Sequence, residues 1–159
     1  MTYFTAHYDS PLGGMTMASD GHALTALCFD GTQSAVCFAG EMSSTTKLPV
    51  FDETRRWLDL YFVGKEPDFL PPLAPKGTPF QQRVWDILLT IPYGKTMSYG
   101  DVARRISPKM SAQAIGGAVG RNPIGIIIPC HRVIGTNGSL TGYASGLDRK
   151  RWLLEMEMK

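Results

Sequence analysis

Short apolar stretches, separated by turn-forming residues, run through the first forty residues of the chain. The segments "SPLGG" and "SDGH" interrupt residues 1–30, and clusters of Gly, Pro, Asp and Ser mark turns between strands. The pattern predicts a β-meander over residues 1–40. Cys28 lies in the alternating stretch "ALTALCFD", where a free cysteine packs as a small hydrophobic residue.

Residues 51–65 have the apolar spacing of an amphipathic helix. Asp52 and Glu53 favour its N-terminus and Gly64 ends it. The segment 66–80 that follows contains four prolines before Pro79 and shows no periodicity, which is typical of a linker. We therefore expect two domains, residues 1–75 and residues 76–159.

Three short helices are predicted after the linker, each with a hydroxyl residue at its N-cap. Thr78 precedes Pro79 at the first helical position, Ser98 precedes a helix over 98–106, and Ser111 precedes "AQAIGGAVG". Two short helices joined by the tight turn "SPKMS" form a helix-turn-helix pattern. The chain ends in a predicted amphipathic helix, "LDRKRWLLEMEMK", in which Leu147, Trp152, Leu153 and Met156 could face inward.

The helix after Ser111 carries few large side chains, because most of its residues are alanine or glycine. Each glycine costs about 1 kcal/mol of helix stability relative to alanine. A helix with such small side chains can nevertheless approach another surface closely. It either packs tightly on a neighbouring helix or enters a narrow DNA groove, and the residues alone leave both interpretations open.

The segment "GIIIPCHRVIG" places Cys130 and His131 side by side after a run of isoleucines. Residues 124–128 are predicted to form a short buried strand or extended segment. Adjacent residues of a strand point to opposite faces, so the two side chains can cooperate only if the chain bends. Pro129 lacks an N–H donor and interrupts strand pairing, and a turn there would present both side chains to one pocket. The polar loop 135–146 follows.

Composition and charge narrow the class of protein. The chain is 43% hydrophobic and 19% charged, which is normal for a soluble globular protein. No apolar run approaches the ~20 residues of a membrane span, and the N-terminus lacks the pattern of a signal peptide. Residues 1–75 carry a net charge of −5 and residues 76–159 carry +7. This division either reflects uneven surface decoration or indicates that the second half binds a polyanion such as nucleic acid.

Three cysteines, Cys28, Cys37 and Cys130, form an odd set without CxxC spacing. This favours a reducing compartment over a disulfide framework, and a cytoplasmic location is expected. The three histidines show no ligand spacing either, so no metal site is expected.

Cys130 is the candidate nucleophile. A cysteine becomes nucleophilic when a neighbouring base or a positive field stabilises its thiolate, and His131 and Arg132 are adjacent to it. The histidine would need an acid to orient its far nitrogen. Spacing alone leaves Asp148, Glu155 and Glu157 open for that role. Adjacency by itself fixes no geometry, and a structural cysteine is the alternative.

The segments "IPCHRVIG", "NGSLTGYASGLDRKRWLLEME", "SYGDVA" and "AIGGAVGRNP" closely resemble the O6-alkylguanine-DNA alkyltransferases (methylated-DNA–protein-cysteine methyltransferases). The resemblance is strong from about Thr78 to Glu157 and weak over the first 75 residues. It implies an α+β fold: a small N-terminal RNase H-like domain with an antiparallel sheet and a helix, and a mainly helical C-terminal domain with the helix-turn-helix and the cysteine. It implies repair of O6-alkylguanine, and O4-alkylthymine, in double-stranded DNA, through minor-groove binding, base flipping and one irreversible transfer to Cys130.

The same resemblance assigns roles residue by residue. Cys130 is the alkyl acceptor, His131 the base acting through a water, Glu157 the acid that orients His131, and Asn122 the link between the recognition helix and the active-site turn. Tyr99, Val133, Tyr143, Ala144 and Ser145 bind the substrate base. Gln113, Ala112, Ala114, Gly116 and Arg121 contact DNA, although Arg121 is given no specific contact. No cofactor or metal, no membrane association and a monomer in solution are implied.

One position departs from the commonest family pattern. Many members carry an arginine in the recognition helix that fills the space left by the flipped base, and Gln113 stands there in this chain. We expect Gln113 to intercalate without contributing charge. Three rival interpretations are a sensor that binds alkylated DNA without repairing it, a cysteine hydrolase with an oxyanion hole, and a helix-turn-helix regulator in which Cys130 is incidental. The sensors of this family lack the cysteine.

Overall fold

The computed structural model describes residues 2–31, 41–44, 47–140 and 142–159. It divides into two compact units, Met1–Lys76 and Gly77–Lys159. Cys37 lies outside the described residues. Within the described residues, no helix is both long and apolar enough to cross a bilayer.

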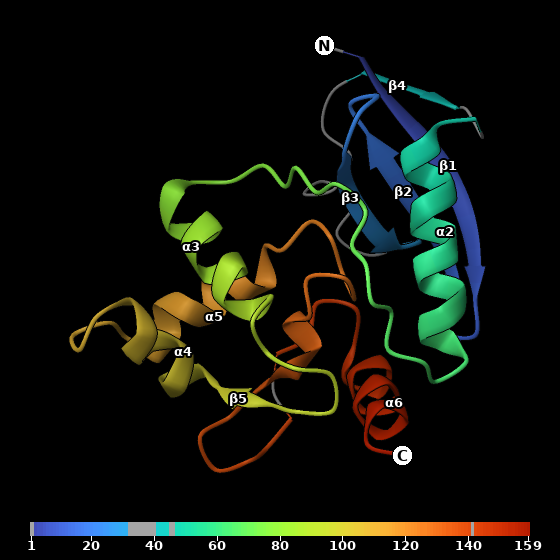
Figure 1. Cartoon of the computed structure of the whole chain (residues 1–159). Coiled ribbons are helices and arrows are strands. Elements are labelled where there is room, and N and C mark those ends of the chain that lie inside the picture. Colours follow the sequence, from blue (N-terminus) through green and yellow to red (C-terminus); the bar gives the residue numbers. More distant parts are fainter. Residues whose placement is uncertain (1, 32–40, 45–46, 141) are drawn as a thin grey trace. The chain divides into compact units, whose positions relative to one another are not determined.

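The first unit is a four-stranded sheet with one helix along its face (Figure 1). The strands are β1 (Thr2–Ser10), β2 (Gly13–Ser19), β3 (Leu24–Phe29) and β4 (Glu41–Ser44), in the order β3-β2-β1-β4. The antiparallel meander predicted from the turn residues is confirmed for β1, β2 and β3. The fourth strand, β4, pairs parallel to β1, a pairing that no turn signal in the sequence indicates.

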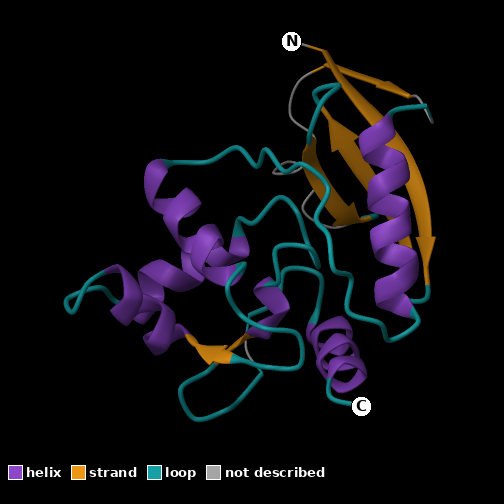
Figure 2. Ribbon diagram, viewed as in Figure 1, coloured by secondary structure: helices purple, strands orange, loops and turns teal. Residues whose placement is uncertain are grey.

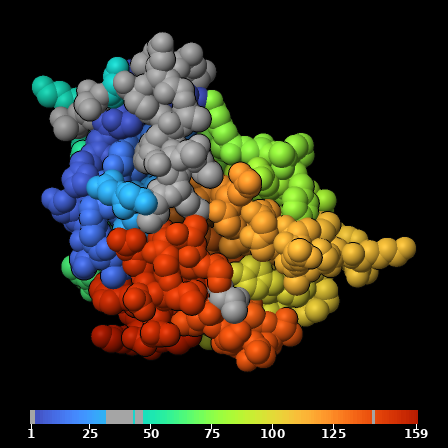
Figure 3. Space-filling model, turned by 180° about the vertical axis from the view of Figure 1, so that it is seen from behind, coloured from blue at the N-terminus to red at the C-terminus, as the bar shows by residue number. Residues whose placement is uncertain are grey.

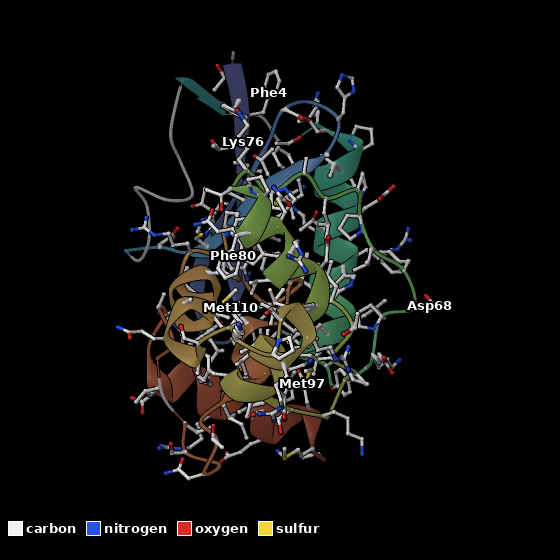
Figure 4. The ribbon with its side chains drawn as sticks, turned by 90° about the vertical axis from the view of Figure 1, so that its left-hand side faces the viewer. Phe4, Asp68, Lys76, Phe80, Met97 and Met110 are labelled. Carbon is white, nitrogen blue, oxygen red and sulfur yellow. The ribbon has the colours of Figure 1, made fainter. Side chains whose placement is uncertain are left out.

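Helix α2 (Pro49–Phe62) buries its apolar side, in which Phe51, Leu58 and Tyr61 are fully inaccessible. It begins two residues before the predicted start, because Pro49 occupies its first turn. Gly64 adopts φ +83° after the helix, a left-handed conformation that glycine tolerates and that ends the helix as predicted. The linker reaches Lys76, labelled in Figure 4, whose ammonium lies 4.5 Å from the centre of the Tyr3 ring.

Cys28 on β3 is buried and disulfide-bonded. The cysteine pattern favoured a reducing compartment over a disulfide framework, and the disulfide at Cys28 differs from that expectation. CxxC spacing could not have revealed it, because a disulfide requires only that two β-carbons meet in the fold. Cys130 is a free thiol.

The second unit is mainly helical, with one small pair of strands (Figure 2). Its elements are α3 (Pro79–Leu88), β5 (Met97–Ser98), α4 (Tyr99–Ile106), α5 (Ala112–Gly120), the 3₁₀ turn η1 (Cys130–Arg132), β6 (Val133–Ile134) and α6 (Leu147–Glu157). Strands β5 and β6 pair in parallel. Met97 and Met110, labelled in Figure 4, lie before and after α4, and the connection between α4 and α5 projects at the right of Figure 3.

The predicted caps of this unit are confirmed. Thr78 accepts a hydrogen bond from the backbone of Gln81, Ser98 from Asp101, and Ser111 from Ala114. The first two form complete capping boxes, in which the third helical residue returns a bond to the cap. These local bonds fix where α3, α4 and α5 begin, and so place the two helices of the helix-turn-helix.

On α3, Trp85 is almost completely buried, and its indole Nε1 donates to the Ala118 carbonyl of α5 at 2.9 Å. Side-chain burial differs from the sequence prediction on the last helix. On α6, Leu153 is buried as expected but Leu147 is 43% exposed, while Lys150 is fully buried. Charged side chains are rarely buried without a partner, so the pattern alone could not indicate that α6 turns charged residues inward.

Residues 124–128 do not form the predicted strand or extended segment. The isoleucines there are buried, but the chain turns, with the Ile127 amide bonded to the Gly125 carbonyl at 2.7 Å and the Ile128 amide bonded to the Ile124 carbonyl at 3.2 Å. Ile126 adopts φ +67°, a conformation that is strained for a β-branched residue. An apolar run reports burial without reporting the backbone period, which explains the error.

Candidate active site

Cys130 begins the 3₁₀ turn η1, immediately after Pro129. Its amide donates to the Ile128 carbonyl at 2.8 Å, and the Arg132 amide donates to the Pro129 carbonyl at 3.0 Å. The bend predicted at Pro129 is therefore present, and the strand-like alternation of Cys130 and His131 is broken. Cys130 is 8% exposed and His131 is fully buried.

Asn122, which follows α5, hydrogen-bonds to the segment that leads into this turn. Its amide Nδ2 donates to the Ile128 carbonyl at 2.9 Å, and its Oδ1 accepts from the Ile124 amide at 3.0 Å. Its side chain also hydrogen-bonds to Cys130. One buried amide therefore connects the helix-turn-helix to the cysteine turn.

His131 pairs with Glu157 from the last turn of α6. The ring Nε2 lies 2.6 Å from Oε2 of Glu157, and both side chains are completely buried. Of the three acids that the spacing left open, Glu157 is the one at hydrogen-bonding distance, whereas Asp148 and Glu155 are exposed. With Nε2 bonded to the carboxylate, Nδ1 is the ring nitrogen that can serve the cysteine.

Arg132 and Lys150 are two buried cations that the predicted set of site residues does not include. Arg132 donates from Nε and Nη2 to the two oxygens of Glu157, at 2.8 and 3.1 Å. Lys150 donates from Nζ to the Val133 carbonyl at 2.5 Å and lies 5.9 Å from the centre of the Tyr99 ring. The position of Arg132 directly after Cys130 and His131 was the only sign in the sequence that it belongs to the site. No feature of the sequence indicates that Lys150 is buried.

Burial and neighbouring charges set the protonation states. Burial raises the pKa of the Cys130 thiol, and the Asn122 hydrogen bond and the Lys150 charge offset only part of this rise. Burial lowers the pKa of His131 despite its bond to Glu157. Burial alone would raise the pKa of Glu157, but His131 and Arg132 together lower it to about 2.

The resting site at neutral pH is therefore a neutral thiol, a neutral imidazole and a carboxylate. The residues beside Cys130 predicted that a neighbouring base or a positive field stabilises a thiolate. The structure favours the protonated thiol, because desolvation outweighs the nearby charges. His131, neutral and oriented by Glu157, is suited to act as that base.

An open groove with a volume of about 710 Å³ lies over α4 and α5. It is lined by Tyr99, Ala112, Gln113, Gly116, Gly120, Gly135, Thr136, Gly142, Tyr143 and Ala144. The groove thus combines predicted substrate-binding residues with predicted DNA-binding residues. Tyr99 donates its hydroxyl to the Gly142 carbonyl at 3.3 Å, which connects the start of α4 to the loop. Gly120, Gly135, Thr136 and Gly142 were not predicted.

The remaining predicted residues lie around this groove. Ala114 and Arg121 are exposed on and just after α5, and Ser145 is half-buried with its carbonyl accepting from Arg149 at 3.1 Å. Val133 is fully buried, and its carbonyl is bonded to Lys150. Within the described parts of the chain, no three His, Cys, Asp or Glu side chains lie close enough together to hold a metal ion.

Comparison with known proteins assigns the class. Residues 79–159 match the DNA-binding domain of 6-O-methylguanine DNA methyltransferase, and residues 3–75 match its ribonuclease-like domain. The chain is 43% identical over 156 residues to a methylated-DNA–protein-cysteine methyltransferase of Haemophilus influenzae, covering 98% of this chain and 86% of the relative. It is 48% identical over 158 residues to that of Mycobacterium bovis, covering 95% and 92%.

Solved structures agree with this assignment. The O6-methylguanine methyltransferase of Mycobacterium tuberculosis superimposes with a TM-score of 0.85 at 44% identity, covering 98% of this chain and 93% of that one. A structure of the same protein (OGT) in complex with DNA gives a TM-score of 0.85, covering 99% and 93%. The chain belongs to the 6-O-methylguanine DNA methyltransferase family. It is an enzyme that transfers methyl groups from methylated DNA to a cysteine of the protein itself, and the predicted α+β fold is confirmed.

Proposed function

We propose that this chain repairs O6-alkylguanine, and also O4-alkylthymine, in duplex DNA by one irreversible transfer of the alkyl group to Sγ of Cys130. Residues 76–159 form the DNA-binding and alkyl-acceptor domain in this proposal, and residues 1–75 form the N-terminal domain with its linker. The observation that carries the proposal is the buried pairing of His131 with Glu157 beside the free thiol of Cys130.

The transfer is a displacement at the alkyl carbon. His131 takes the thiol proton through a water, Sγ attacks the carbon, and the carbon–O6 bond breaks as the sulfur–carbon bond forms. The proton returns to the departing guanine, so the products are a thioether and unmodified guanine. A thioether is not reversed by thiol exchange, and each molecule therefore acts once.

Access to the carbon requires the base to leave the helix, because a base inside the duplex stack cannot be reached. The small residues Ala112 and Gly116 on α5 allow close approach in a minor groove only ~6 Å wide. Gln113 fills the space that the flipped base leaves. Tyr99 and the loop from Tyr143 to Ser145 then hold the base in the groove described above.

Backbone groups complete recognition of the base. The Ala144 N–H donates to the alkylated oxygen, and the carbonyls of Cys130 and Val133 accept from the exocyclic amine. The Val133 carbonyl already accepts from Lys150, but a carbonyl oxygen has two lone pairs and can take a second donor. The bond from Lys150 keeps this carbonyl in a fixed direction.

The test is the intact mass of the protein after incubation with duplex DNA that contains O6-methylguanine. We expect one methyl group per protein, located at Cys130 by peptide mapping and absent from Cys130→Ser. Duplexes containing O4-methylthymine test the second substrate separately. Unmodified protein beside unrepaired DNA would contradict the proposal and favour a sensor of alkylated DNA, and release of product over repeated turnovers would favour a hydrolase.

A further inference from the structure

The Glu157 carboxylate receives four hydrogen-bond donors. Oε1 accepts from Arg132 Nε at 2.8 Å and from the Gly94 amide at 3.2 Å. Oε2 accepts from His131 Nε2 at 2.6 Å and from Arg132 Nη2 at 3.1 Å. An ionised carboxylate has about four lone-pair sites, and of these four bonds one goes to the histidine.

Arg132 supplies two of these four bonds and also connects the Glu157 carboxylate to the backbone of another segment. Its remaining terminal nitrogen, Nη1, donates to the Ile91 carbonyl at 2.8 Å, and its side chain is 10% exposed. The planar guanidinium therefore has fixed partners on two sides, the carboxylate from α6 and the loop that follows α3. A two-pronged contact of this kind fixes both the position and the rotation of a carboxylate.

We propose that Arg132 is a positioning residue for alkyl transfer, which holds Glu157 so that its carboxylate orients His131 but does not take the proton. The proposal rests on the proposed function of the Cys130 site. Because Arg132 and Gly94 donate to the same carboxylate and favour its ionised form, the proton withdrawn from Cys130 stays on the imidazole. His131 can then return it to the departing guanine.

The charges around His131 support this role. Glu157 and Lys150 face it from α6, and Cys130 and Arg132 accompany it on η1. Glu157 favours the protonated imidazole, whereas the cations Arg132 and Lys150 disfavour it. Removal of Arg132 would leave Glu157 less restrained and take away one of these two cations. Loss of the Arg132 cation raises the pKa of His131, so more of the histidine would be protonated, and inactive as a base, at a given pH.

The experiment compares Arg132→Gln and Arg132→Lys with Arg151→Gln, a matched control. Arg151 is an exposed arginine of α6 whose ion pair with Asp148 spans 3.9 Å. Single-turnover transfer is followed by rapid quench with excess methylated duplex over a range of pH. The amplitude of this reaction counts correctly folded protein, and the rate constant reports the chemistry. DNA affinity is measured in parallel on the same duplex.

For Arg132→Gln we expect a rate constant roughly ten- to hundredfold lower, the range typical when an outer partner of a functional histidine is lost. The acid limb of its pH–rate profile should move to higher pH, with DNA affinity unchanged. Arg132→Lys, which keeps the charge but not the fork, should recover part of the rate and most of the pH profile. Arg151→Gln should match the wild type. A reduced amplitude with an unchanged rate constant and profile would show a structural role only and overturn the inference.

A measurement on the unaltered protein keeps the inference testable if the variants fold poorly. Nitrogen-15 NMR of the imidazole rings identifies the tautomer of His131, with His131→Gln used for assignment. We expect a neutral ring protonated at Nε2 at pH 7, whereas an imidazolium at pH 7 would contradict the inference. Failure of the wild type to methylate Cys130 would reject the proposed function itself, which is a different outcome.

Discussion

The indole Nε1 of Trp85 donates a hydrogen bond to the Ala118 carbonyl, 2.9 Å away, and this bond joins α3 to α5. Ala118 also accepts from the Arg121 amide at 3.2 Å. Its carbonyl therefore keeps a partner if the indole is removed. The position of α5, which carries Gln113 and the glycines of the groove, depends in part on this contact.

Replacement of Trp85 by phenylalanine should destabilise the protein, although the Ala118 carbonyl keeps a hydrogen-bond donor. We expect a loss of about 1 to 3 kcal/mol in the free energy of unfolding, from the lost bond and the space left by the smaller ring. Urea unfolding followed by circular dichroism measures it. An unchanged unfolding midpoint would show that the Trp85–Ala118 bond contributes nothing to the stability of the protein.

Glu157→Gln should impair both stability and chemistry, because it leaves the buried Arg132 cation without its counter-ion. Removal of one partner of a buried ion pair costs about 3 to 5 kcal/mol. The rate of methyl transfer to Cys130 should also fall, since His131 loses its anionic partner, while DNA binding changes less.

The matched control is Glu155→Gln, which removes an exposed carboxylate two residues earlier on the same helix. Its unfolding midpoint and transfer rate should equal those of the wild type. Equal losses of transfer and DNA binding in Glu157→Gln would argue that the carboxylate acts only through the fold.

Stability should fall as the solution becomes acidic. His131 has a pKa in the folded protein below its ordinary value of 6.5, so below about pH 6.5 the unfolded chain binds a proton that the folded protein does not. Glu157, whose pKa is lowered from 4.5 to about 2, adds a second loss as pH falls below 4.5 and toward 2. Both signs agree: protonation favours unfolding.

Urea titrations at pH 7, 6, 5 and 4 test this dependence. The free energy of unfolding should decrease at each step, and the decrease between pH 7 and pH 5 should be smaller in His131→Gln. His22→Gln, which removes an exposed histidine, is the control and should keep the wild-type slope. Stability that is flat or rises toward pH 5 would contradict a neutral, buried His131.

Gln113→Ala separates base flipping from chemistry. Gln113 is exposed on α5 and lines the groove, and no described contact makes it part of the fold. Transfer from O6-methylguanine in duplex DNA should slow, because the space left by the flipped base is no longer filled. Transfer from a free O6-alkylguanine base should stay unchanged, since nothing has to be flipped. Similar losses on both substrates would remove Gln113 from this role.

Local rules were sufficient to predict the helix starts in the second unit. Thr78, Ser98 and Ser111 each satisfy an amide three residues ahead, so the signal is complete within a few residues of sequence. The path of residues 124–128 could not be predicted in the same way. Their turn depends on Asn122, whose amide bonds to the Ile128 carbonyl and the Ile124 amide. The run of apolar residues does not indicate those bonds.

The site shows the same contrast. The adjacency of Cys130 and His131 was visible in the sequence, and the resemblance to a family selected Glu157 from three acids. Arg132 and Lys150 were not predicted as site residues, because a charged side chain is normally solvated. Their burial follows from partners distant in sequence, the carboxylate of Glu157 and the carbonyl of Val133, which only the fold brings near.

The near-complete burial of Cys130 bears on how such a protein survives in a cell. A protein that reacts only once is lost whenever its sulfur meets a stray electrophile or oxidant. With 8% of the residue exposed and a thiol whose pKa is raised by burial, little reactive thiolate is offered to small molecules in solution. Under the proposed function, the seclusion of the sulfur reserves the protein's one reaction for a base delivered by DNA.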